Sequence, residues 1–467
     1  MNVTDIIYRK SFFAQRRKDA KKILSALATS WQKKYLIALI CSIVYVNLFS
    51  VVPGFSQSDS LSKYLDIAAK NNPTVLQRFN EFQAALQKIP QVGSLPDPEL
   101  SAGVFLSPME LVSGKQIADL RLMQMFPWFG VLKYGKDEMS LMAKAKFELF
   151  RDAKLQVCYD VQRTWYELYK VQKDISISEK NIEILKLIER LALVRFKSGS
   201  SPQTGSMGAS AEGSGLADIY RIQIESGELE NNIALLKNQQ NSIIAKFNAY
   251  LNRQVTSPVY TPENITRDSL EFSLTVVSDS MLANNPMLGM LNVEKQSLEA
   301  RKKMVTRMGY PMVGLGLNYS LIGKSATSMG APDMNGKDMV MPMVVFTIPI
   351  YRKKYTAMQN EAELMKAASS ENYQATANSL QSEYYQALLL YHDAGRRIKL
   401  YKNQCELASK SLDLMLKSFS TSSSELTDVL RIRQQTLDYE LRQVEAVADF
   451  NTAIAWLKRL MAYSQIQ

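Results

Sequence analysis

The sequence has almost none of the residues from which most catalytic sites are built. Its 467 residues include a single histidine, His392, and only three cysteines. One histidine argues against His-based zinc catalysis and against Ser–His–Asp triads. Cys41, Cys158 and Cys405 are too widely spaced to indicate a disulfide framework. The sequence also offers no nucleophile–base pair and no glycine-rich phosphate loop, so we expect neither an enzyme nor a bound cofactor.

Acidic residues are fewer than basic ones, 45 against 56, which gives a formal net charge of +11. An excess of this sign is typical of nucleic-acid-binding proteins, but here it is concentrated at one end of the chain. Residues 1–56 contain nine basic and two acidic residues, that is +7 of the +11. The rest of the chain is only mildly basic, so we expect no nucleic acid as a partner.

The N-terminal segment 1–56 has the pattern of a secretory signal peptide with a long basic extension. An apolar run, Leu36–Val52, follows Lys33 and Lys34 and ends at Pro53, with a predicted cleavage site before Gln57. A permanent N-terminal anchor is the alternative, and residues 1–32 are either a long basic region or a start-site artefact. If the signal is real, the mature protein is exported. No later stretch reaches the roughly 18 apolar residues of a membrane-spanning helix.

The mature chain contains an internal repeat. Asn71-Asn72-Pro73 recurs as Asn284-Asn285-Pro286, and apolar residues with 3-4-3-4 spacing over 219–250 recur 210 positions later over 429–460. Sustained spacing of this kind predicts long helices that pack knobs-into-holes. We therefore predict a first repeat over 57–252, a connector over 253–273 and a second repeat over 274–467.

Each repeat is expected to have the same order of elements, which gives a mainly α fold with a small β part. A helix is followed by a strand hairpin, a long helix, a turn and a second long helix. The predicted helices are 60–90, 131–198 and 216–252 in the first repeat, and 275–308, 352–419 and 425–463 in the second. The hairpins are 99–127, with strands 99–106 and 117–126, and 312–349, with strands 312–321 and 339–348. The Ser/Gly-rich turn of the first repeat is 198–215.

The four predicted strands are about ten residues long, which is the length of a strand that spans a membrane at a tilt. Four strands cannot close a barrel, and an open sheet edge is not stable in lipid. Several copies of the chain would therefore have to share one barrel. The alternative is an ordinary soluble hairpin at the end of a coiled coil.

The order and spacing of these features resemble the TolC-type outer-membrane efflux protein family. The motifs that carry the resemblance are the duplicated Asn-Pro, the segment Phe126-Pro127-Trp128-Phe129-Gly130 and the turn segments Gly215–Ile219 and Glu425–Leu430. The resemblance implies a homotrimer with a shared twelve-stranded outer-membrane β-barrel and a periplasmic α-barrel of coiled-coil helices.

The resemblance further implies that the chain is an exit duct that serves a periplasmic adaptor and an inner-membrane RND-type pump. It would lie in outer-membrane lipid and extend into the periplasm. The rival functions are a general drug-efflux or type I secretion duct, and an exported coiled-coil structural or adaptor protein without a barrel.

The resemblance also implies a periplasmic gate at the helical turns, where Asp218 and Asp428 match the tip positions. In a trimer these residues would form acidic rings, which repel like charge and attract cations. Arg221 and Arg431 follow three residues later, where some relatives are acidic, and this favours Asp–Arg pairing that holds a closed state. Alternatively, both aspartates only complement the helix dipole.

Aromatic residues gather where strands meet helices, at Phe126, Trp128, Phe129 and Tyr351. Such girdles are typical of the membrane interface, although simple core packing would also use them.

Met339, Met341 and Met343 alternate along one strand and so share one of its sides, which faces either lipid or lumen. Thioethers suit Cu(I), and the surrounding segment 335–343 is similar to outer-membrane components of copper/silver and divalent-cation efflux systems. These methionines are weak candidates for metal contact, because methionine also fills gaps in apolar packing. We expect no other metal site.

Overall fold

The computed structural model describes residues 61–197, 211–268, 274–326, 332–421 and 425–463. All of them belong to one unit, Asp59–Gln467. The predicted signal peptide, most of the turn 198–215 and residues 269–273 of the predicted connector lie outside the described residues. None of the described helices is apolar enough over a sufficient length to cross a membrane.

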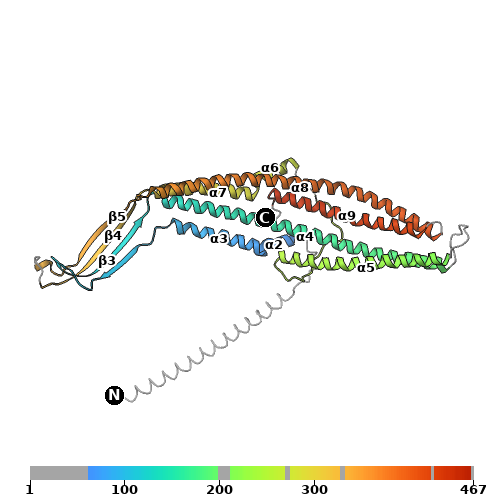
Figure 1. The fold of residues 1–467 in the computed structure, drawn as a ribbon, viewed down its shortest axis with the longest axis horizontal. Helices are drawn as coiled ribbons and strands as arrows, with labels where there is room; N and C mark the ends of the chain where they lie inside the picture. Colours follow the sequence, from blue (N-terminus) through green and yellow to red (C-terminus); the bar gives the residue numbers. More distant parts are fainter. Residues whose placement is uncertain (1–60, 198–210, 269–273, 327–331, 422–424, 464–467) are drawn as a thin grey trace, which may run out of the picture. The chain divides into compact units, whose positions relative to one another are not determined.

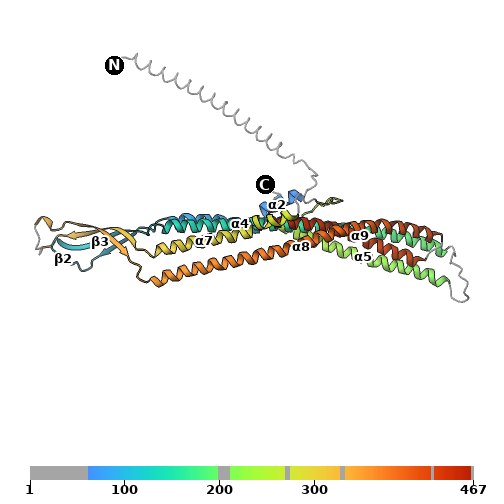
Figure 2. The same cartoon turned by 90° about the horizontal axis from the view of Figure 1, so that it is seen from above.

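The elements occur in the same order in the two halves of the chain. The first half consists of α2 (Leu61–Asn71), α3 (Pro73–Gly93), β1 (Glu99–Val104), β2 (Glu110–Leu111), β3 (Gly114–Phe126), α4 (Val131–Lys197) and α5 (Ala211–Tyr250). The second half consists of α6 (Leu274–Asn284), α7 (Pro286–Met308), β4 (Met312–Gly323), a 3-10 turn (Pro332–Met334), β5 (Met339–Thr347), α8 (Arg352–Ser420) and α9 (Leu426–Leu460). The strands lie at one end of this unit, and the last turns of α4 and α8 and the first turns of α5 and α9 lie at the other (Figures 1 and 2).

The structure corrects the predicted elements at four places. The helices expected at 60–90 and 275–308 are each two helices, which are broken before Pro73 and Pro286. The two-residue strand β2 adds a fifth strand to the four expected. Helix α5 begins at Ala211, inside the segment 198–215 that was expected to be a turn.

The breaks follow from the repeated Asn-Pro dipeptide. Proline lacks an N–H and fits the first turn of a helix, while the asparagine before it is a strong N-cap. Asn72 accepts hydrogen bonds from the backbone N–H of Thr74 and Val75, and its Nδ2 donates to the Tyr250 carbonyl at 2.8 Å. Asn285 caps α7 through the Met287 N–H. Asn72 thus also ties the start of α3 to the end of α5.

The strands form one antiparallel sheet in the order β1-β3-β4-β5, with β2 paired to β3 beside β1. The pairing of β3 with β4, from Lys115 opposite Gly323 to Phe126 opposite Val313, joins the two halves of the chain. Among the described residues, β1 and β5 are the two edges of this sheet.

The two faces of the sheet differ in chemistry. Directly paired residues point to the same side, so the register assigns each side chain to a face. The face that we call apolar exposes large hydrophobic residues over all four long strands, namely Leu100, Leu120, Leu122, Leu315, Leu317, Val340, Val344 and Phe346. The other face, which we call polar, carries Asp119, Arg121, Asn318 and Ser320 together with methionine and glycine. Asn318 and Ser320 donate hydrogen bonds to Asp119 Oδ1, both at 2.9 Å.

The helices are held together by apolar clusters, two of which lie within the second half of the chain. The largest cluster packs α2, α4 and α5 around Tyr64, Trp165, Leu168 and Phe247. The described part of the connector, 253–268, lies against these helices, where the Tyr260 N–H donates to the Tyr64 hydroxyl and its carbonyl accepts from the Trp165 indole.

Candidate functional site

The four long helices meet in a single apolar cluster at the end of the unit away from the sheet (Figure 1). Its fully buried members come from all four long helices and include Ile188 of α4, Ile222 of α5, Phe419 of α8 and Val429 of α9. The tip positions singled out from the sequence, Asp218 and Asp428, each directly precede a buried member of this cluster, Ile219 or Val429.

The second-half pair behaves as an ion pair within one helix. Arg431 Nη2 lies 3.0 Å from Asp428 Oδ1, and both side chains are exposed. Asp428 is also in the first turn of α9, where a negative charge complements the helix dipole. In the first half, Asp218 is half-buried and Arg221 is exposed. The structure therefore places all four residues at the same end of the unit, and their part in gating stays a prediction.

Behind the tip, the structure contains a charged group that the sequence analysis missed. Arg433 of α9 is only 4% exposed, and among the described residues its Nε has no hydrogen-bond partner. Burial lowers the pKa of Arg433 and raises the pKa of Glu225 and Glu440, which both lie near it. Arg433, Glu225 and Glu440 form a charged layer at a level where the heptad spacing predicts only apolar contacts. Burying charge is costly unless the charge is paired.

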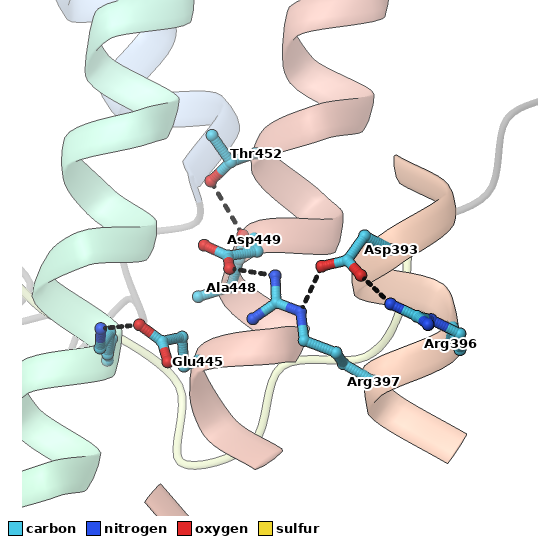
Figure 3. A network of polar contacts seen from close by, with 8 residues as sticks. Asp393, Arg396, Arg397, Glu445, Ala448, Asp449 and Thr452 are labelled. Carbon is cyan, nitrogen blue, oxygen red and sulfur yellow. Dashed lines mark hydrogen bonds and ion pairs between the residues drawn. The ribbon is translucent and has the colours of Figure 1, made fainter. Parts of the chain in front are cut away.

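A second polar network crosses the middle of the bundle (Figure 3). Arg397 of α8 joins Asp393 of the same helix to Asp449 of α9, with its Nη2 2.7 Å from Asp449 Oδ2. One turn earlier on α9, Glu445 pairs with Lys170 of α4 at 2.5 Å. Helix α9 is thus linked by charge to a helix of each half, and sequence spacing alone gives no sign of these long-range pairs.

The predicted interface aromatics lie where the strands join the helices. Trp128 stacks on Tyr310 with ring centroids 5.5 Å apart, while Phe129 and Tyr351 are 86% and 79% exposed. Gly130 has a φ of +95°, a conformation that glycine adopts without strain, and it turns the chain from β3 into α4. Tyr310 was not predicted, although its place before Pro311, which directly precedes β4, is a usable signal.

The predicted methionines lie on the polar face of the sheet. Met339 is paired with Ser320, Met341 with Asn318 and Met343 with Gly316. Val340, Val344 and Phe346 of β5 project to the opposite side, and whether the methionine side faces lipid or lumen stays a prediction. Among the described residues, no cluster of His, Cys, Asp or Glu is arranged to hold a metal ion.

Comparison with solved structures identifies the fold. No family model matches the sequence, and no curated protein does. Among solved structures, the channel-forming protein CusC is similar with a TM-score of 0.71 and 13% identity, over 87% of this chain and 92% of CusC. The outer-membrane protein VceC of Vibrio cholerae gives 0.69 and 12% over 86% and 96% of the two chains. The open outer-membrane channel MtrE of Neisseria gonorrhoeae gives 0.67 and 15% over 86% and 88%. The resemblance inferred from the motifs is thus confirmed for the fold.

Proposed function

We propose that this chain, which has the fold of outer-membrane efflux channels, is the outer-membrane exit duct of a tripartite efflux system. Three copies would share one barrel and one helical tunnel, and the chain would carry out no chemistry. A periplasmic adaptor and an inner-membrane pump would deliver the cargo. The similar structures are channels, and this supports the same passive role here.

The observation that carries the proposal is the sheet with two open edges and an exposed apolar face. Leu100, Val344 and Phe346 are 72%, 59% and 62% exposed, which is unfavourable in water over so many neighbouring side chains. The opposite face is polar. Membrane barrels show the same division, with an apolar outer face toward lipid and a polar interior. An edge strand in lipid has to be paired, so the proposal needs further copies of the chain.

The strand directions are compatible with closure. Each neighbouring pair in the order β1-β3-β4-β5 is antiparallel, so β5 runs opposite to β1. The β5 strand of one copy can therefore pair with β1 of the next in the same antiparallel sense. Three copies would give twelve long strands, an even number as bacterial single-chain outer-membrane barrels have.

We place the gate at the helical turns. Asp428 and Arg431 would repeat three times around the tunnel. Pairing with Arg431 would neutralise the three Asp428 carboxylates, which would otherwise repel one another. The layer of Glu225, Arg433 and Glu440 lies behind the tip, between the helices of each copy. Opening would require these contacts to rearrange.

The cargo is the finer part of the proposal. The methionine-bearing polar face favours metal cations, because a duct for drugs or secreted polypeptides has no need of thioethers there. A general drug-efflux or type I secretion duct remains the second candidate.

Extraction and electrophoresis test the proposal directly. We expect the protein to leave membranes only with detergent and to run faster without heating than after boiling, as folded barrels do. A freely soluble monomer would overturn the duct and favour an exported coiled-coil protein. Metal-sensitivity profiling of a deletion strain then separates the metal cargo from the others.

A further inference from the structure

Six methionines share the polar face of the sheet, three more than the sequence pattern suggested. Met123 and Met125 project from β3, Met312 projects from β4, and Met339, Met341 and Met343 project from β5. The strand between them, β4, presents Gly314 and Gly316 opposite Met125 and Met123. This short stretch of sheet, which has no side chains of its own, is flanked by Met123 and Met125 on the β3 side and by Met343 and Val345 on the β5 side.

The sulfur atoms of β3 converge over this stretch. A Cβ atom built on Gly314 would lie 2.6 Å from Met125 Sδ and 3.2 Å from Met123 Sδ, and one on Gly316 would lie 3.1 Å from Met123 Sδ. Side chains at these positions would collide with the thioethers, so the glycines leave the room that the sulfurs occupy. Met343 is paired with Gly316 from the other side and is half-buried.

The chemistry of this group is soft and neutral. Thioethers are ligands for Cu(I) and similar soft cations, whereas Mg²⁺ and Ca²⁺ take oxygen ligands. Two carboxylates share this face: Glu99 of β1 is paired with Met123, and Asp119 of β3 accepts hydrogen bonds from Asn318 and Ser320. Met123 is only 9% exposed, so the site excludes much of the water that would compete with weak ligands.

We propose that Met123, Met125 and Met343 form a binding station for a soft monovalent cation, Cu(I) or Ag(I), on the polar face of the sheet. Met341 and Met339 continue the row toward the N-terminal end of β5. The binding of the ion depends only on the sheet of a single chain. The further statement that this binding station faces a lumen rests on the proposed duct.

Silver binding to the purified full-length protein in detergent tests the station. The background has Cys41, Cys158 and Cys405 replaced by alanine, because thiols would otherwise take the metal. The variant Met123→Leu/Met125→Leu removes both converging sulfurs at nearly constant volume. The control Met358→Leu/Met365→Leu removes two thioethers from α8. Equilibrium dialysis counts bound Ag(I), and X-ray absorption identifies the ligand atoms.

We expect about one Ag(I) per chain with sulfur ligands in the parent and in the α8 control, as thioether chemistry predicts. The Met123/Met125 variant should lose that ion. Met343→Leu should bind it at least roughly tenfold more weakly, the scale seen even for outer-shell changes at metal sites. Equal binding by the Met123/Met125 variant, or no binding by the parent, overturns the station.

The assembly state of the same samples separates this result from the fate of the proposed duct. Trimers without silver refute the station alone. Monomers that bind silver refute the duct alone.

Discussion

Replacing Asp174 by asparagine should stabilise the protein at neutral pH. Asp174 lies on α4, one turn after Lys170, whose ammonium is engaged by Glu445 at 2.5 Å. Its Oδ1 is buried and accepts no hydrogen bond among the described residues. Burial raises the pKa of Asp174 from 3.8 to about 6, against a smaller opposing effect of Lys170. The charged carboxylate is therefore a cost to the folded state, and asparagine removes it.

The size and the pH dependence of the effect follow from the two pKa values. The folded-state pKa lies above the unfolded one, so the folded chain holds more protons between about pH 4 and pH 6. Stability is lost as the pH rises through that window. The difference corresponds to about 3 kcal/mol above pH 6, as an order of magnitude. Asp174→Asn should recover most of this above pH 6 and almost none at pH 4.

Urea unfolding followed by tryptophan fluorescence measures the effect at fixed protein concentration, because assembly also contributes to stability. The parent, Asp174→Asn and Asp137→Asn are compared at pH 7.5 and pH 4. Asp137 is an exposed residue of the same helix, and its replacement should leave the midpoint unchanged. The reasoning fails if Asp174→Asn is less stable than the parent at pH 7.5, or if it gains equally at both values.

Three further changes probe other parts of the molecule. Asn72→Ala should cost about 2 kcal/mol or more, since it removes an N-cap and the hydrogen bond to the Tyr250 carbonyl; a loss under about 0.5 kcal/mol in thermal unfolding would contradict this. Leu317→Arg on the apolar face should lower barrel stability by roughly 2–4 kcal/mol at mid-membrane depth, measured as loss of the heat-modifiable form, and normal assembly would argue against lipid contact there. Asp428→Lys replaces the ion pair with Arg431 by like charges, so single-channel conductance or antibiotic leakage should rise, and unchanged behaviour would reduce Asp428 to a helix-end role.

Local features of this fold could be predicted from the sequence because they depend on neighbouring residues. The heptad pattern predicts α4 and α8 to within one residue at each end, since their length requires a continuous apolar stripe. The breaks before Pro73 and Pro286 were missed, although the Asn-Pro signal was present and N-capping explains it. The spacing of apolar residues gave no sign of these breaks, because a break of one residue leaves the helical pattern nearly in register.

Long-range features could not be predicted in this way. The pairing of β3 with β4 brings together residues about 200 positions apart, and this pairing fixes the face on which the methionines lie. Without it, Met123 and Met125 had no visible connection with Met343. The ion pairs Arg397–Asp449 and Lys170–Glu445 likewise depend on how the helices cross.

Disulfide cross-linking between the two sheet edges tests the central claim, that three chains close one barrel. Ala102→Cys on β1 is combined with single cysteines scanned along 340–346 of β5, in a background without the native cysteines. At the matching register, oxidation should join the chains of membrane-embedded protein into a covalent species of three and no more. Chains that stay monomeric at every register, or a ladder that continues beyond three chains, would contradict the shared barrel.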